Sequence, residues 1–149
     1  MPNHCFNRIH INVGDSDAIS FESVVESLHD DEEQNTVFDF NAIIPMPSEL
    51  KNTTKGHGKE PPDETKNARL RKKHGADNWY DWSISNWSTK WNSYDSEIVN
   101  HEIGERIEYT FNTAWGPPTS VIEALREQCP DLHISAFYDE EGMEIAGYY

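Results

Sequence analysis

Two histidines and a glutamate are the residues that the sequence places best for acid–base or metal chemistry. His10, Glu108 and His133 each fall on the polar side of an alternating stretch, so all three are expected on one face of a sheet. Imidazole and carboxylate groups that meet in this way exchange protons near neutral pH or hold a metal ion. The alternative is a hydrated polar face with no chemistry, which is the commoner arrangement for such residues.

The motifs of common catalytic sites are not found. The sequence has no Gly-x-Ser-x-Gly, no phosphate-cradling glycine loop, no His-Glu-x-x-His and no Cys-x-x-Cys. Cys5 and Cys129 lie far apart and are expected to be buried, reduced thiols. We therefore predict no catalytic residues, no metal and no cofactor, and a protein that is not an enzyme.

Two neighbouring segments combine aromatic and basic residues. In residues 78–91, Tyr80, Ile84, Trp87 and Trp91 have the spacing of one helical face, at least as far as Trp87. Clustered tryptophans either stack on bases and sugars or pack a core, and the helical spacing favours packing. The other segment, with a short helix expected over 64–73, is a basic arm that could contact phosphates, dock on an acidic surface or stay solvated. Its cations are Lys66, Arg69, Arg71, Lys72 and Lys73.

Alternating apolar and polar residues predict the strands that position these groups. The period of two runs over residues 5–13, 106–113 and 132–138, and residues 143–148 are expected to return as a further strand. Another strand is expected over residues 37–44. It stops at a proline because proline cannot donate to a ladder of hydrogen bonds.

Apolar residues at helical spacing predict two helices, over 21–28 and from Pro118 to before Pro130. The element order β-α-β, insertion, β-α-β-β is typical of an α+β protein with a ferredoxin-like β-α-β-β-α-β sandwich, an antiparallel sheet with both helices on one face. We expect a single domain over 1–149. A Trp/Lys-rich insertion is expected at about 48–104, partly mobile over its basic part 51–75.

Charge divides the chain into an acidic body and a basic arm. The formal net charge is −15, yet eight of the twelve Lys and Arg residues lie between Lys51 and Lys73, beside three acids. That segment carries 8 − 3 = +5, and the remainder carries 24 acids against four cations, or −20. An acidic body repels nucleic acid and attracts basic protein surfaces. The alternative is that the charge serves only solubility.

The N-terminus shows neither a basic region nor an apolar stretch, and no apolar run approaches the length of a membrane span. We therefore expect no signal peptide, no membrane association and a cytoplasmic location.

Five stretches contain sequence motifs that are similar to those of a known family: residues 1–8, 38–47, 82–92, 111–118 and 140–143. Together they resemble the YubB ferredoxin-like domain family, proteins carried mainly by phages and plasmids. The resemblance covers most of the chain outside the basic insertion. Where the family pattern has a tryptophan and a glycine, this chain has His4 and Ser88. The resemblance implies the ferredoxin-like fold and a mobile element of a bacterial host, and it implies no activity.

The shared motifs also suggest a candidate binding set near the expected strand ends: Asn7, Lys90, Trp91, Asn112, Trp115 and Glu141. The alternative is that these residues fix turns and pack the insertion, since Asn and Glu often cap backbone groups at such places.

Three functions remain open at this point. The leading hypothesis is a non-enzymatic acidic interaction protein that binds and inhibits a basic host protein, such as a defence or nucleic-acid-handling component. The second is nucleic-acid binding through residues 66–73 and the tryptophans. The third is an enzyme with a site on the open sheet face, built from His10, Glu108 or His133.

Overall fold

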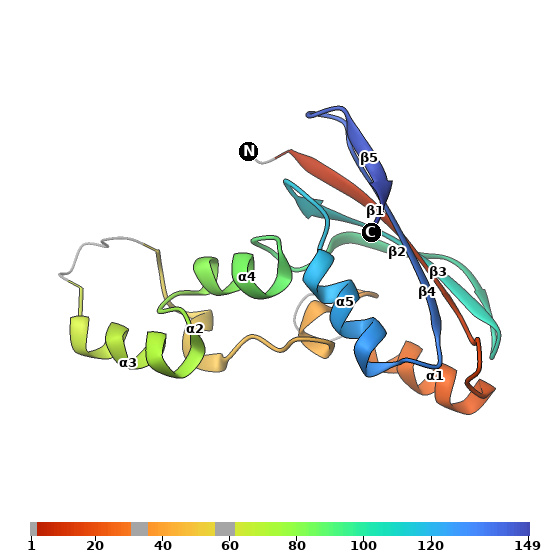
Figure 1. The fold of residues 1–149 in the computed structure, drawn as a ribbon, viewed down its shortest axis with the longest axis horizontal. Helices are drawn as coiled ribbons and strands as arrows, with labels where there is room; N and C mark the ends of the chain where they lie inside the picture. The colour runs from red at the N-terminus through yellow and green to blue at the C-terminus, as the bar shows by residue number, and fades with distance from the viewer. Residues whose placement is uncertain (1–2, 31–35, 56–61) are drawn as a thin grey trace.

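The computed structural model describes residues 3–30, 36–55 and 62–149. Its centre is a five-stranded antiparallel sheet in the order β2-β3-β1-β4-β5 (Figure 1). The strands are β1 His4–Asn12, β2 Tyr94–Glu102, β3 Arg106–Ala114, β4 His133–Glu140 and β5 Ile145–Tyr148.

Two helices, α1 (Ala18–Ser27) and α5 (Thr119–Gln128), lie on the same side of the sheet (Figure 1). With the first four strands they follow the order β-α-β-β-α-β, so the predicted ferredoxin-like α+β fold is confirmed. The fifth strand, β5, extends the sheet beyond β4. Within the described ranges, no helix is both long and apolar enough to cross a membrane.

Alternation along the strands separates a core face from an open face. On β1, Cys5, Asn7, Ile9 and Ile11 are buried toward the helices, while the residues between them are more exposed. β3 repeats the pattern and contributes Tyr109, which is fully buried, to the same core. The open face therefore carries the polar residues of the predicted chemistry.

The insertion between α1 and β2 is helical and belongs to the same core. It contains α2 (Ser48–Lys51), α3 (Glu64–His74) and α4 (Trp79–Trp87). Leu50, Leu70, Trp82 and Trp87 are buried in one cluster with side chains of the sheet and of α5. This arrangement confirms the helix expected over 64–73 and a packing role for Trp82 and Trp87. The expected stripe of Tyr80, Ile84, Trp87 and Trp91 is not the packing face, because of these four residues only Trp87 is buried. The mobility predicted for 51–75 stays a prediction, and residues 56–61 lie outside the described part.

The prediction of a strand over residues 37–44 is wrong. That segment forms a short 3₁₀ helix, η1 (Phe40–Ala42), capped by Asp39, whose carboxylate accepts the N–H of Asn41. Phe38 and Phe40 are both fully buried, and their rings contact Phe111. Every second residue is buried, which produced the sequence pattern of a strand. The segment nevertheless packs beneath the sheet and does not pair with it.

The place of the missing strand is taken by β2, so the insertion ends before Tyr94 and not at 104 as expected. β2 lies at an edge of the sheet, most of its residues are exposed, and its pairing with β3 shifts register twice. An edge strand with these irregularities has no clean alternation of apolar and polar residues, which is why the sequence pattern did not reveal it.

Candidate functional site

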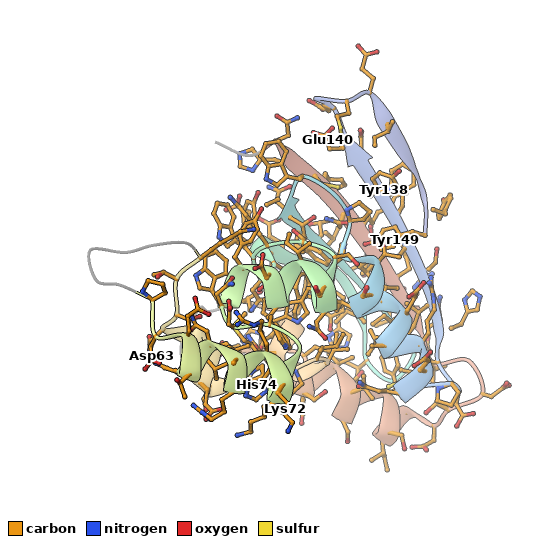
Figure 2. The ribbon with its side chains drawn as sticks, turned by 60° about the vertical axis from the view of Figure 1, so that its left-hand side comes forward. Asp63, Lys72, His74, Tyr138, Glu140 and Tyr149 are labelled. Atoms are coloured by element: carbon orange, nitrogen blue, oxygen red, sulfur yellow. The ribbon has the colours of Figure 1, made fainter. Side chains whose placement is uncertain are left out.

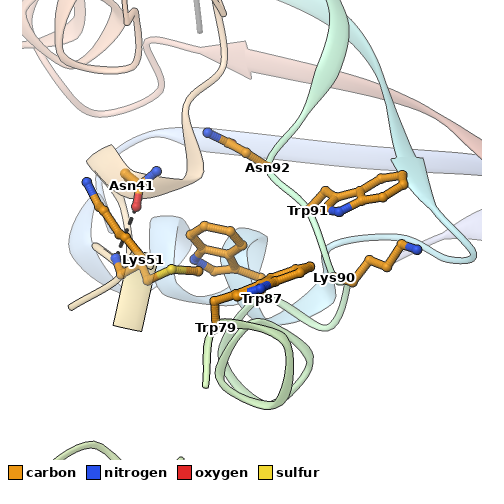
Figure 3. Close-up of a pocket in the computed structure, with 8 residues that line it drawn as sticks. Asn41, Lys51, Trp79, Trp87, Lys90, Trp91 and Asn92 are labelled. Carbon is orange, nitrogen blue, oxygen red and sulfur yellow. Dashed lines mark hydrogen bonds between the residues drawn. The ribbon is translucent and has the colours of Figure 1, made fainter. Parts of the chain in front are cut away.

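A cavity of about 340 Å³ lies between η1, α2 and the α4–β2 connection (Figure 3). We call it the tryptophan–lysine pocket. Its lining combines aromatic rings, two ammonium groups and two amides from Asn41, Met46, Lys51, Trp79, Trp87, Lys90, Trp91 and Asn92. Lys90 and Trp91, which the sequence analysis named together, therefore line one cavity. The other lining residues were not linked to this pair by the sequence.

Helix α4 positions the aromatic side of the pocket. It begins after Asn78, whose side-chain oxygen accepts the N–H of Asp81, and it ends at Trp87 because Ser88 adopts a left-handed conformation with φ of 66°. The helical stripe therefore stops before Trp91. The Trp91 ring is 40% exposed, and the Lys90 ammonium lies 3.9 Å from its centroid.

The amide side of the pocket is held by internal hydrogen bonds. The Asn92 side chain donates to Asp39 at 2.7 Å and accepts the N–H of Phe40 at 2.9 Å. Asn41 accepts the N–H of Met46 at 3.0 Å. These bonds use the amides to fix the wall, so the aromatic rings and the Lys90 ammonium group are the parts of the lining that we consider for recognition.

Two other members of the predicted set meet at a second cavity. Asn112 and Glu141 line a depression of about 330 Å³ on the open face, together with His4, Phe6 and Asp139. A row of rings connects the region to the first pocket, because His4 Nδ1 lies 2.6 Å from the hydroxyl of Tyr94, and Tyr94 contacts Trp91 edge to face. Trp115 is 51% exposed and lines neither cavity.

Asn7, the remaining member, has a structural position. It is fully buried on the core face, and its amide donates to the carbonyl of Cys5 at 3.0 Å and to Thr113 Oγ1 at 2.9 Å. Its oxygen accepts the hydroxyl proton of Tyr149 at 2.9 Å. Burial raises the pKa of the Cys5 thiol to about 11, which disfavours a thiolate nucleophile.

Glu140 is a buried carboxylate that the sequence pattern did not single out. It is the last residue of β4, beyond Tyr138 on the same strand, and lies far from the labelled Lys72 and His74 of α3 (Figure 2). Glu140 Oε2 accepts the N–H of Met143 at 2.6 Å, and Oε1 has no hydrogen-bond partner among the residues that the structure describes. The bond to Met143 fixes the turn between β4 and β5.

Most of the basic arm is neutralised inside the molecule. Glu49 of α2 accepts hydrogen bonds from His74 at 2.7 Å and from Lys73 and Arg69 at 3.2 Å, and these bonds lower the pKa of Glu49 to about 2. Arg71 pairs with Asp77 and lies 3.6 Å from Glu64. Among the described residues, Lys66 and Lys72 form no ion pair.

The expected cluster of two histidines and a glutamate does not form. His10 and Glu108 are opposite residues on β1 and β3, with 3.6 Å between Nε2 and Oε1. His133 is exposed and lies opposite Asn12. No group of three metal-binding side chains occurs in the described ranges.

One end of the sheet carries a concentration of carboxylates, which we call the acidic end. It is formed by residues 13–27, 101–106 and 129–133, which contain seven acids and one cation, Arg106. The three segments are in contact: Asp15 N–H donates to the carbonyl of Asp131, and Gly104 N–H donates to the Glu22 carboxylate. The acids are Asp15, Asp17, Glu22, Glu26, Glu102, Glu105 and Asp131.

Two exposed isoleucines lie within the acidic end. Ile19 is 82% exposed and Ile103 is 75% exposed. They flank Ala18 and Gly104, which are in close contact, since a Cβ on Gly104 would lie 2.8 Å from Ala18 Cβ. Sequence reasoning gave the overall acidity but missed this surface, because the three segments that form it are far apart in the chain.

The comparisons with known proteins bear on the C-terminal part of the chain. No curated protein and no solved structure matches the sequence. Residues 86–149, which run from the end of α4 through β5, match the family model described as a ferredoxin-like domain in Api92-like protein.

Proposed function

We propose that the protein is a non-enzymatic acidic interaction protein that binds a basic protein partner through the acidic end. The observation that carries the proposal is the charge of this surface, where seven carboxylates meet one arginine, or −7 + 1 = −6. A surface of one sign attracts a partner of the opposite sign and raises the rate of association.

The carboxylates of the acidic end are largely available to a partner. Glu22 is engaged by His101 and by the Gly104 N–H, and Glu102 pairs with Arg106. Asp17 caps α1 through hydrogen bonds from Ser20. The other four form no ion pair with any described residue; they are Asp15, Glu26, Glu105 and Asp131.

The two isoleucines favour a protein partner over another cation. Ile19 and Ile103 are largely exposed, and protein interfaces commonly have an apolar centre and a polar rim. Host proteins that handle nucleic acid present basic surfaces of the required sign. With the mobile-element origin that the motifs imply, occupation of such a surface would inhibit the host protein.

Nucleic-acid binding by the basic arm has weaker support. Three of its five cations, Arg69, Arg71 and Lys73, are engaged by carboxylates of the same chain, which leaves fewer charges for phosphates. The enzymatic alternative loses its expected cluster, because only His10 and Glu108 approach each other.

Affinity capture from bacterial lysate tests the proposal with a matched pair of variants. One variant neutralises the acidic end (Asp15→Asn, Glu26→Gln, Glu105→Gln), and the control neutralises three exposed acids elsewhere (Glu97→Gln, Glu123→Gln, Glu144→Gln). We expect one stoichiometric protein that survives nuclease treatment. The wild type and the control should retain it, while the acidic-end variant and about 0.5 M salt should release it.

Variants of the two exposed isoleucines provide a second test of the same surface. Ile19→Ser combined with Ile103→Ser should weaken capture without changing the net charge. If the acidic-end variant retains the same partner as the control, or if capture disappears with nuclease, the acidic end is not the binding surface.

A further inference from the structure

The tryptophan–lysine pocket differs from the rest of this acidic molecule in offering aromatic faces and positive charge together. We propose that it binds a nucleotide unit, a planar base that carries a phosphate group. This site is separate from the acidic end, since its walls come from η1, α2 and the α4–β2 connection, whereas α1 and the β2–β3 turn lie elsewhere (Figure 1).

Two tryptophans provide the surface for the base. Trp91 is 40% exposed and Trp79 is partly exposed. Trp79 is the first residue of α4, Trp91 follows the end of α4, and both line the cavity (Figure 3). Trp87 forms the floor, where its Nε1 donates to the carbonyl of Ile44 at 2.9 Å and holds the ring in place. Rings that are fixed in advance stack on a base with little loss of side-chain entropy.

Lys90 provides the charge for the phosphate. Lys51, at the end of α2, and Lys90, beside Trp91, both line the cavity, and Lys90 forms no ion pair among the described residues. The carboxylate behind this wall, Asp39, already accepts hydrogen bonds from Asn92 and from the N–H of Asn41. The balance of positive and negative charge at the cavity therefore favours an anionic ligand over a cationic one.

Size and long-range charge restrict the ligand further. A cavity of about 340 Å³ is within the usual range for small-molecule sites. A long polyanion would be repelled by the remainder of the molecule, which carries −20 outside residues 51–73. The unit bound is therefore a free nucleotide or the phosphorylated end of a short single strand, and these two sources share the same chemistry.

Calorimetric titration of the full chain with adenosine 5′-monophosphate tests the proposal, with adenosine and inorganic phosphate as partial ligands. We expect the monophosphate to bind more tightly than either part. Trp91→Leu should weaken its binding by about 5- to 150-fold, the range for loss of one stacked base. Lys90→Gln should weaken it by about two- to fivefold, as expected for one exposed charge.

Matched controls separate the pocket from other aromatic and basic residues. Trp115→Leu removes a tryptophan that is 51% exposed and lines neither cavity, and Lys72→Gln removes a cation of α3. Both should bind the monophosphate like the wild type. Lys90→Gln is a surface change that keeps the test valid even where Trp91→Leu fails to fold.

A 5′-phosphorylated tetranucleotide distinguishes the two sources of the ligand. Tighter binding than the monophosphate, with the same loss in Lys90→Gln, supports a strand end, and weaker binding supports a free nucleotide. No heat from the monophosphate at millimolar concentration overturns the proposal. It is equally overturned by unchanged binding in Lys90→Gln and Trp91→Leu, or by oligonucleotide binding that only Lys72→Gln reduces.

Discussion

A hydrogen bond between two residues far apart in the chain defines the structural role of Asn7. The Asn7 side chain is fully buried and accepts the hydroxyl proton of Tyr149 at 2.9 Å. Burial raises the pKa of Tyr149, so the phenol stays a neutral donor at ordinary pH. Because the Asn7 side chain is buried and hydrogen-bonded in this way, we expect it to contribute to stability.

Tyr149→Phe should lower the free energy of unfolding by about 1–3 kcal/mol, because it leaves the buried Asn7 oxygen without its donor. The neighbouring Tyr148 is 73% exposed, and Tyr148→Phe should change the same quantity by no more than about 0.5 kcal/mol. Urea denaturation of both variants measures the difference. Equal effects would mean that the Asn7–Tyr149 bond contributes nothing specific to stability.

At the element scale, one carboxylate of α2 links that helix to three side chains of α3. Glu49 accepts hydrogen bonds from His74, Lys73 and Arg69, which lower its pKa to about 2. The folded-state pKa lies below the unfolded value of about 4.3, so the stabilisation is complete above that value and is lost as the pH falls toward about 2.

Glu49→Gln should therefore lower the midpoint of thermal unfolding at pH 6, and its difference from the wild type should shrink between pH 5 and about pH 2. Scans at several pH values measure this convergence. Arg69→Gln serves as the matched control, since it should destabilise the wild type but not the Glu49→Gln background. A difference that stays constant down to pH 2 would contradict the assigned pKa shift.

The elements also show what the sequence could and could not predict. Strands β1, β3 and β4 each bury one row of side chains, so their alternation revealed them. β2 exposes most of its residues at a sheet edge, and residues 37–44 bury Phe38 and Phe40 without pairing in the sheet. In both cases tertiary position, which a local pattern does not encode, decided the outcome.

For a similar reason, the sequence predicted only part of the lining of the candidate pocket. The motif around Trp91 drew attention to Lys90 and Trp91, which line the cavity. The opposite wall comes from Asn41 and Lys51. These residues line the same cavity as the tryptophans only because the chain folds back on itself. The left-handed Ser88 ends α4 and turns Trp91 out of the helical stripe, and no periodicity signals such a stop.

At the scale of the whole molecule, the charges are arranged so that attraction and repulsion act in different places. The cations of α3 are largely paired with Glu49 and Asp77, whereas four carboxylates of the acidic end have no ion pair among the described residues. A net charge of −15, of which −7 + 1 = −6 lies at the acidic end, disfavours the compact state through self-repulsion, and a basic partner would relieve the repulsion when it binds.

Salt should therefore stabilise the isolated protein. Raising sodium chloride from about 20 mM to about 500 mM reduces the screening length severalfold, which weakens repulsion among exposed carboxylates more than attraction in short pairs. We expect the midpoint of thermal unfolding to rise with salt. The acidic-end variant (Asp15→Asn, Glu26→Gln, Glu105→Gln) should start higher at low salt and respond less, because part of the repulsion is already removed. A midpoint that falls with salt would show instead that the ion pairs of Glu49 and Asp77 outweigh the repulsion, and the isolated acidic end would then carry little electrostatic strain for a partner to relieve.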